Sequence, residues 1–233
     1  YKRQSLGRLP RQLRTAMLGC VITLLLDVDG TLIDSFPGIR AGFIHALDAV
    51  GWEHPDDEFI ARIPGPPMEE TLTSVGMDDT TRKKAFAAYM DFTHAGGWQN
   101  AQAFPGMRDL LKGWKEEGIQ VVTATSKGEG FARAILEREG MLEFIDFLGA
   151  AQEDGPRRRK ADVIAHVLDN VEVGRGLMIG DRLHDIEGAA QFGLSTAAVT
   201  WGYGTQDEWN RAWAIAHTPA ELARIVTAFK EEQ

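Results

Sequence analysis

The sequence predicts an α/β protein whose parallel sheet carries helices on both faces and whose first strand is followed by an all-helical insertion. Short apolar runs alternate with helical patterns from residue 105 onward, as in strands joined by crossover helices. Residues 35–103 show helical patterns only. We therefore predict a core of residues 17–34 and 104–233, and a small helical cap of residues 35–103.

Size and charge narrow the class of protein further. A chain of 233 residues can bury one core with room for a smaller second lobe. The net charge of −9 argues against a nucleic-acid-binding surface, which needs a basic patch. Cys20 is the single cysteine, so no disulfide can form within the chain, and this fits a reducing cytoplasm. No apolar run approaches the roughly 20 residues that span a bilayer.

Residues 1–16 differ from the rest of the chain because they are basic and contain no acidic residue. A basic arm or a targeting peptide is one interpretation. We favour a disordered extension or an expression remnant, with Met17 near the true start.

The predicted elements follow in chain order. The apolar run Val21–Leu26 is typical of a short, fully buried strand. Helices are predicted in the cap over 36–50, 68–75 and 80–92. In the core, helices are predicted over 106–118, 130–139, 160–168, 186–192 and 219–230, and strands over 119–124, 144–148, 176–179 and 195–199. Thr218 is expected to cap the last helix.

Two carboxylates, Asp27 and Asp29, stand directly after the first strand. Gly30 permits a turn that can re-aim Asp29 once the strand has ended. Two like charges at one strand end repel each other unless a cation holds them. The pair therefore indicates a metal site.

Other reactive side chains occupy the ends of later strands. Thr125 and Ser126 follow one strand, Asp181 and Asp185 follow another, and Lys160 begins a helix. In open α/β sheets, ligands bind at the carboxyl ends of the strands. Together these residues supply anionic metal ligands, a nucleophile, hydroxyl donors and a cation, which phosphoryl transfer requires.

The order of these motifs resembles the haloacid dehalogenase superfamily, and within it the phosphoglycolate phosphatase-like branch with a helical cap. Residues 27–35 match the pattern D-x-D-G-T-L-x-D-S residue for residue. Thr125-Ser126-Lys127 stands at the second motif, Lys160 at the third and Gly180-Asp181 with Asp185 at the fourth. The resemblance implies a Rossmann-like core and covers the chain from Val21 to about Leu222.

The resemblance also implies the roles of four acidic residues. Asp27 would attack phosphorus and form an aspartyl-phosphate, and Asp29 would act as general acid and base. Asp27, Asp29 through its backbone carbonyl, Asp181 and Asp185 would hold Mg²⁺. The alternatives are a plain turn at Asp27 and Asp29, and helix capping by Asp181 and Asp185.

The phosphate and the rest of the substrate are assigned to polar residues of core and cap. Thr125, Ser126 and Lys160 would hold the phosphoryl oxygens, and Lys160 would also restrain the nucleophile. Lys160 could instead be a solvated surface residue, since three arginines precede it. Arg62 is the candidate cap residue for binding an anionic group of the substrate.

The resemblance implies a cytoplasmic, Mg²⁺-dependent phosphomonoester hydrolase of small phosphorylated metabolites, similar to phosphoglycolate phosphatase. A 5′-nucleotidase acting on nucleoside monophosphates is the first alternative. A sugar-phosphate mutase and a non-catalytic binding protein are further alternatives. We expect a monomer or homodimer with no nucleic-acid polymer and no membrane as partner.

Overall fold

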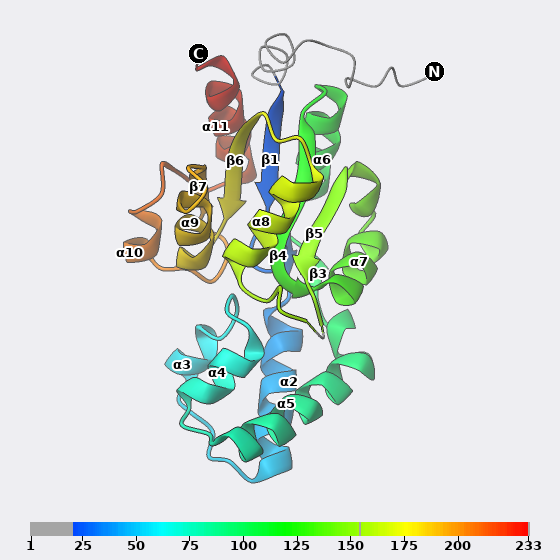
Figure 1. The fold of residues 1–233 in the computed structure, drawn as a ribbon, viewed down its shortest axis with the longest axis vertical. Coiled ribbons are helices and arrows are strands. Elements are labelled where there is room, and N and C mark those ends of the chain that lie inside the picture. The colour runs from blue at the N-terminus through cyan, green and yellow to red at the C-terminus, as the bar shows by residue number, and fades with distance from the viewer. Residues whose placement is uncertain (1–20, 154, 233) are drawn as a thin grey trace.

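A six-stranded sheet forms the centre of the molecule. The computed structural model describes residues 21–153 and 155–232, and Figure 1 shows their fold. The strand order is β5-β4-β1-β6-β7-β8, and every neighbouring pair is parallel. The strands are β1 (Ile22–Leu26), β4 (Gln120–Gly128), β5 (Phe147–Ala151), β6 (Arg175–Gly180), β7 (Ser195–Val199) and β8 (Ala214–Ala216). The predicted parallel sheet is confirmed.

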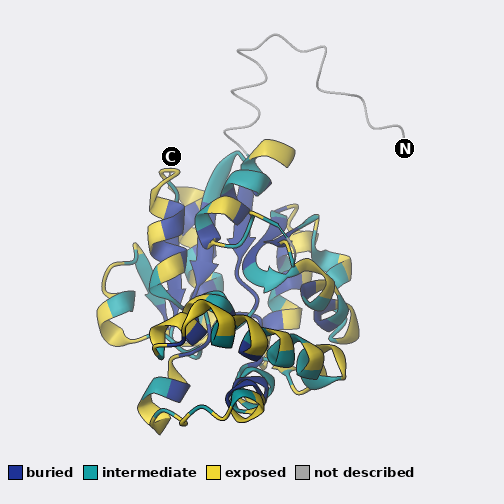
Figure 2. Ribbon diagram, turned by 60° about the horizontal axis from the view of Figure 1, so that its bottom comes forward, coloured by how far each residue is buried: buried dark blue, intermediate teal, exposed yellow. Residues whose placement is uncertain are grey.

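Helices cover both faces of this sheet. The core helices are α6 (Met107–Glu116), α7 (Glu129–Arg138), α8 (Lys160–Asn170), α9 (Leu183–Ala190) and α11 (Pro219–Glu231). Apolar side chains of α6, α7 and α11 pack on one face, and those of α8 and α9 pack on the other. Figure 2 shows that buried residues concentrate in the strands while exposed residues lie on the outer helices.

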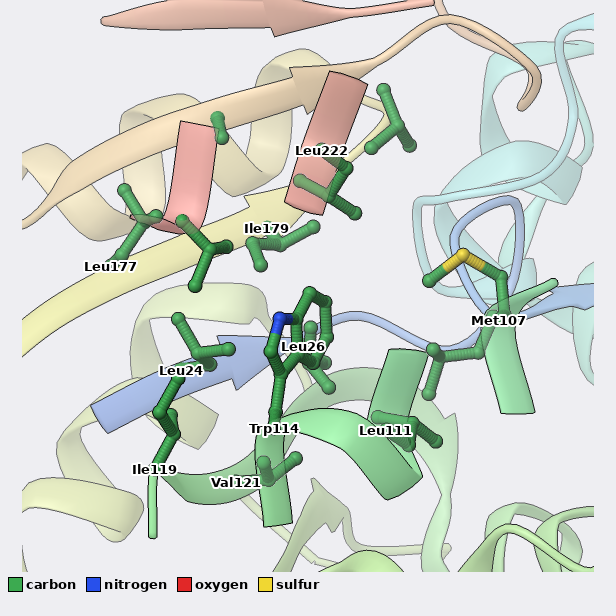
Figure 3. Packing of buried hydrophobic residues seen from close by; sticks show 14 of the residues in the cluster. Leu24, Leu26, Met107, Leu111, Trp114, Ile119, Val121, Leu177, Ile179 and Leu222 are labelled. Carbon is green, nitrogen blue, oxygen red and sulfur yellow. The ribbon is translucent and has the colours of Figure 1, made fainter. Parts of the chain in front are cut away.

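Strand β1 is buried on both faces, as its continuous apolar run predicted. Leu24 and Leu26 belong to the cluster beneath α6, and Leu25 belongs to the cluster on the opposite face. Figure 3 shows Leu24 and Leu26 beside Trp114 of α6. Each of the three leucines is fully buried, which stabilises the fold by about 1.5–3 kcal/mol per side chain. This packing fixes the position of the residues that follow β1.

Four helices form the cap between two very short strands. They are α2 (Phe36–Val50), α3 (Asp57–Ala61), α4 (Met68–Ser74) and α5 (Asp79–His94). The strands β2 (Ile33–Asp34) and β3 (Gln102–Ala103) pair antiparallel at the junction with the core. The cap helices share a separate apolar cluster, built around Phe43 and Leu72. In Figure 1 they lie below the sheet, at the end to which β1 points.

Several elements differ from the prediction. The sequence did not predict α3, β2, β3, β8 or the four-residue α10 (Gln206–Trp209). Elements this short contain too few residues to display the repeat of a helix or a strand. Strand 195–199 is therefore not the last strand. Strand β5 begins later than predicted, since Leu142–Phe144 forms a 3-10 turn, named η3.

Two further predictions concern the ends of the chain. The hydroxyl of Thr218 accepts a hydrogen bond from the Glu221 amide at 3.2 Å, so the predicted cap of α11 is confirmed. The predictions for residues 1–16, Met17 and Cys20 lie outside the described residues. Across the part of the chain that the structure describes, no helix is both long and apolar enough to cross a membrane.

Candidate active site

Three neighbouring strands bring the predicted catalytic residues together. The central strands run in the order β4-β1-β6, and their carboxyl ends carry Thr125, Asp27 and Asp181. The Asp27 amide donates to the Ile179 carbonyl at 2.9 Å, which ties the first residue after β1 to β6. The parallel arrangement of the sheet therefore builds the site.

Asp27, Asp181 and Asp185 form a compact group of buried carboxylates. One oxygen from each lies within 4.8 Å of the others. Oδ1 of Asp181 is buried without a hydrogen-bond partner, and a buried anionic oxygen without a partner is costly. Oxygen ligands in this arrangement suit a hard divalent cation, so the three residues could hold a metal. The carboxylate of Asp29 does not join this group among the residues described.

Glycines leave the space that Asp181 occupies. A Cβ atom added to Gly30 or to Gly202 would collide with the Asp181 carboxylate. The Tyr203 amide donates to Oδ2 of Asp181 at 2.6 Å, and the Trp209 indole donates to its carbonyl at 2.9 Å. Asp181 is thus held from the side of β7 while its second oxygen faces the other carboxylates.

Burial controls the protonation of this group. It raises the pKa of Asp27 to about 6, against the opposing effect of Lys160 and with a smaller contribution from the charge of Asp185. Burial also raises the pKa of Asp181 well above its usual range, and the charges of Asp185 and Asp27 add to the effect. A bound cation would favour the ionised forms of Asp27 and Asp181.

Lys160 lies between two of the carboxylates. Its Nζ is 2.8 Å from Oδ1 of Asp27 and 2.8 Å from Oδ1 of Asp185, and it donates to the Ala124 carbonyl at 2.8 Å. Burial would lower the pKa of this amine, but Asp185 and Asp27 outweigh burial and raise it above its usual value. Lys160 is therefore a buried ammonium group that holds the Asp27 carboxylate in place.

Asp29 has different partners from Asp27. Its carboxylate accepts from the Ser35 hydroxyl at 2.6 Å and from Nζ of Lys127 at 3.0 and 3.2 Å. The sequence placed Lys127 inside the second motif but assigned it no role. The register of β4 against β5 shifts between Thr125 and Gly128, so the strand bulges at Lys127. Its position in the second motif was the one sequence feature that could have indicated a role for Lys127, because a bulge produces no periodic pattern in the sequence.

The remaining predicted residues divide into two groups. Thr125 is buried, and its hydroxyl accepts from the Lys127 amide at 3.2 Å. Thr125 and Ser126 both line the cavity beside Asp27. Arg62 is not brought to the site: its guanidinium pairs with Glu58 one turn earlier on α3 and is 60% exposed. The prediction that Arg62 contacts substrate finds no support, because the local pair turns the side chain to solvent.

A cavity, here called the cap cavity, lies between the cap and the strand ends. It measures about 810 Å³, part of which is open to solvent, and it reaches both Asp27 and Asp29. Its walls come from the loop 63–69, from α5 and from residues 125–128 and Phe131 of the core. A cavity lined by apolar side chains and a few polar groups suits a small organic molecule.

Comparison with known proteins gives the family. Residues 24–199 match the family described as haloacid dehalogenase-like hydrolase. A protein of Mycobacterium tuberculosis named tyrosine-protein kinase PtkA is 39% identical over 186 residues, which are 79% of this chain and 64% of that protein. The match therefore spans less than two thirds of the length of that relative.

Two phosphatase-type relatives are covered almost completely. A 5′-nucleotidase of Pseudomonas aeruginosa is 32% identical over 87% of this chain and 92% of its own. The crystal structure of a predicted phosphatase from Clostridium acetobutylicum superposes with a TM-score of 0.84 at 29% identity, over 89% of this chain and 99% of that chain. The chain belongs to the haloacid dehalogenase-like hydrolases.

Proposed function

We propose that the protein is a Mg²⁺-dependent phosphomonoesterase that hydrolyses a small phosphorylated metabolite through an aspartyl-phosphate on Asp27. The observation that supports this most strongly is the placement of Asp27. Its buried carboxylate lies against the Lys160 ammonium group and beside Asp181 and Asp185, and the cap cavity opens onto it. A nucleophile, metal ligands and room for a substrate thus coincide.

The first half of the reaction belongs to Asp27. Its carboxylate oxygen attacks phosphorus, and the bond between phosphorus and the leaving oxygen breaks. Thr125 and Ser126 donate hydrogen bonds to the phosphoryl oxygens, and Lys160 orients the attacking carboxylate. Asp27, Asp181 and Asp185 would hold Mg²⁺, which would supply positive charge that offsets the repulsion between the carboxylate and the phosphoryl group.

Both halves of the reaction depend on Asp29. It protonates the leaving oxygen and then removes a proton from the water that attacks the aspartyl-phosphate. The hydrogen bond from Ser35 and the ion pair with Lys127 fix the direction in which its carboxylate points. Asp29 lines the cap cavity beside Asp27, where a leaving group would lie.

Replacement of the nucleophile tests this assignment. Asp27→Asn is expected to abolish Mg²⁺-dependent turnover of p-nitrophenyl phosphate while the circular dichroism spectrum stays native. Asp109→Asn, at an exposed position of α6, is the matched control and should retain full activity. Retention of more than a small fraction of activity in Asp27→Asn would show that another group attacks phosphorus.

Phosphoglycolate and nucleoside 5′-monophosphates are the two leading candidates for the physiological substrate. Turnover of phosphoglycolate and of nucleoside 5′-monophosphates, measured side by side with Mg²⁺, distinguishes a phosphoglycolate phosphatase from a 5′-nucleotidase. A slowly decaying phosphoenzyme with sugar phosphates, without release of inorganic phosphate, would instead indicate a mutase. We place the reaction in the cytoplasm, and the monomeric or homodimeric state stays a prediction.

A second function is favoured by the relative named tyrosine-protein kinase, which is 39% identical. In that case Asp27 or a neighbouring group would take part in the transfer of a phosphoryl group from a nucleotide to the hydroxyl of a tyrosine, and water would not be the acceptor. Incubation with γ-labelled ATP and a tyrosine-containing protein substrate separates the two. Label on tyrosine supports the kinase, and release of inorganic phosphate alone supports the phosphatase.

A further inference from the structure

We propose that the cap cavity binds an uncharged leaving group with a flat apolar part, such as an aromatic ring or the base of a nucleoside, and disfavours a leaving group that carries a second anionic group. This inference rests on the proposed phosphatase function, since it concerns the part of the substrate that leaves phosphorus. It assigns specificity to named residues of the cap and of α7.

The walls of the cap cavity are mainly apolar. Six of the side chains are Ile39, Ile63, Met68, Phe86, Met90 and Phe131. They come from α2, from the loop and helix around residue 65 and from α5, with Phe131 facing them from core helix α7. Such walls favour a ligand that gains by leaving water.

Aromatic rings line both sides of this cavity. The Phe86 and Tyr89 rings of α5 have centroids 6.4 Å apart and an interplanar angle of 19°. Phe131 lines the cavity from the core. Flat side chains in the cap and core parts of the lining suit a flat ligand, because ring faces and edges attract other rings.

The cations of the cavity are already paired. Among the described residues that line it, these cations are Lys127 and Arg158. Lys127 pairs with Asp29, and Arg158 pairs with Glu69 of the cap. The Arg158 guanidinium also donates to the carbonyls of Gln152 and Glu153 at 2.7 Å. A carboxylate on the leaving group would have to break one of these pairs.

The acidic lining raises the cost for such a group further. Asp29, Glu69 and Glu153 lie on the same cavity, in addition to the nucleophile Asp27. A bound divalent cation would offset the charge of Asp27. Around the leaving group, the three other carboxylates would still outnumber the cations Lys127 and Arg158. Like charges brought together in a partly desolvated site repel each other, so an anionic leaving group is disfavoured.

Two aryl phosphates that differ only in charge provide the test. 4-Ethylphenyl phosphate and 4-(carboxymethyl)phenyl phosphate share a ring and release phenols of similar basicity. We expect kcat/KM to be at least about tenfold higher for the uncharged ester, the factor that about 1.4 kcal/mol of differential binding produces. Equal values, or a preference for the carboxylate, would overturn the proposal while leaving the phosphatase function intact.

Binding to an inactive protein separates this inference from the proposed function. Calorimetric titration of Asp27→Asn with the same two esters gives their affinities without turnover. Tighter binding of the ethyl compound upholds the proposal even if the wild-type protein hydrolyses neither ester, a result that would sink the phosphatase function alone. Tighter binding of the carboxymethyl compound contradicts the proposal in either case.

A change of one wall residue adds an independent measurement. Met90→Arg places a cation on the half-buried wall and should reduce the preference for the uncharged ester by about tenfold. Met90→Leu, a volume-matched control, should keep the wild-type ratio. An unchanged ratio in a folded Met90→Arg protein would overturn the proposal, and if that variant does not fold, the wild-type ratio decides.

The last part of the experiment compares the aryl esters with phosphate esters of natural metabolites. Hydrolysis of nucleoside 5′-monophosphates at rates comparable to 4-ethylphenyl phosphate assigns the cap cavity to nucleosides. Hydrolysis of the aryl esters without the nucleotides assigns it to aryl groups, and either result upholds an uncharged leaving group. A higher kcat/KM for phosphoglycolate than for both classes would contradict it.

Discussion

Nζ of Lys127 lies 3.0 Å from Oδ1 of Asp29 and joins the bulge in β4 to the loop after β1. Both side chains are largely buried, at 13% and 15% exposure, so the pair is screened less than an ion pair on the surface. The contact orients the carboxylate that we assign as acid and base, in a direction that Ser35 also favours.

Removal of Lys127 should therefore impair catalysis more than folding. Lys127→Met is expected to lower kcat for p-nitrophenyl phosphate by about 10- to 100-fold, because a partner that orients a reactive group has effects of that order. Lys127→Arg should restore part of the loss. Lys112→Met serves as the control, since Lys112 makes a 3.9 Å pair with Glu116 on the surface. A kcat within twofold of wild type would show that Asp29 needs no such partner.

Asp181 should limit the stability of the protein when no metal is bound. Asp181→Asn removes a buried negative charge and keeps an oxygen for the Tyr203 amide. In EDTA at pH 8 we expect the variant to be more stable by about 1 kcal/mol, or about 2–4 °C in Tm. Mg²⁺ should raise the Tm of the wild type and leave the variant unchanged, as differential scanning calorimetry would record.

The pH dependence of that difference follows from the raised pKa of Asp181. A carboxyl group whose pKa is higher in the folded than in the unfolded protein stabilises the fold when protonated, and this contribution is lost as the pH rises. The wild type should therefore approach the variant in stability as the pH falls from 8 to 5. Asp27, with a pKa of about 6, adds to the trend in both proteins. A constant difference across this range would show that Asp181 stays ionised.

The cap is held to the core by arginines that the sequence did not single out. Arg158 pairs with Glu69, and the neighbouring Arg159 pairs with Glu70 at 2.9 Å. Arg158→Gln should raise KM for p-nitrophenyl phosphate about threefold or more through weaker closure of the cap. The free energy of unfolding should change by less than about 1 kcal/mol, as is usual for a partly exposed ion pair.

Arg62→Gln is the matched control for Arg158→Gln. It breaks an exposed pair that lies within α3, so KM should stay within about twofold of wild type. A rise in KM equal to that of Arg158→Gln would return Arg62 to the substrate site. The double variant Arg158→Gln with Glu69→Gln should be no worse than either single variant if the two act as a pair.

Gly202 should be required for metal binding through the space it leaves. In Gly202→Ala, the new Cβ would collide with the Gly30 carbonyl oxygen and with the Asp181 carboxylate, and the carboxylate would be displaced. Calorimetric titration should show an affinity for Mg²⁺ at least about tenfold weaker than in wild type. Gly113→Ala, in α6 where nothing lies within 4 Å of the new Cβ, should bind Mg²⁺ normally and be more stable by about 0.5–1 kcal/mol. Normal affinity in Gly202→Ala would mean that Asp181 is not a ligand.

The positions of the acidic residues could be predicted because they depend on sheet topology alone. Asp27, Thr125 and Asp181 each follow a strand with a clear apolar pattern, and neighbouring parallel strands end at one edge of the sheet. Lys160 could be placed through its position at the first turn of a helix. These residues needed no knowledge of side-chain contacts.

Lys127 and Arg62 show which contacts such reasoning leaves out. A bulge is an irregularity in strand pairing, and residues 125–128 carry no pattern that distinguishes it from a regular strand end. Arg62 was assigned to substrate as a cationic residue of the cap, and its pairing with Glu58 four residues earlier was not recognised because α3 was not predicted. A contact between distant segments decides the surroundings of Lys127, and a local ion pair decides those of Arg62.

The antiparallel pairing of β2 with β3 has a consequence for how this protein can be altered. The chain leaves the core after Asp34 and returns at Gln102, and these two residues are partners in the same two-residue ladder. The two ends of the intervening helical segment therefore lie side by side, and the segment joins the core at this one place. Its replacement by another segment with closely spaced ends requires only two junctions and leaves the strand order of the sheet untouched. Substrate range can then be re-engineered by exchange of this segment while the carboxylates around Asp27 keep their positions.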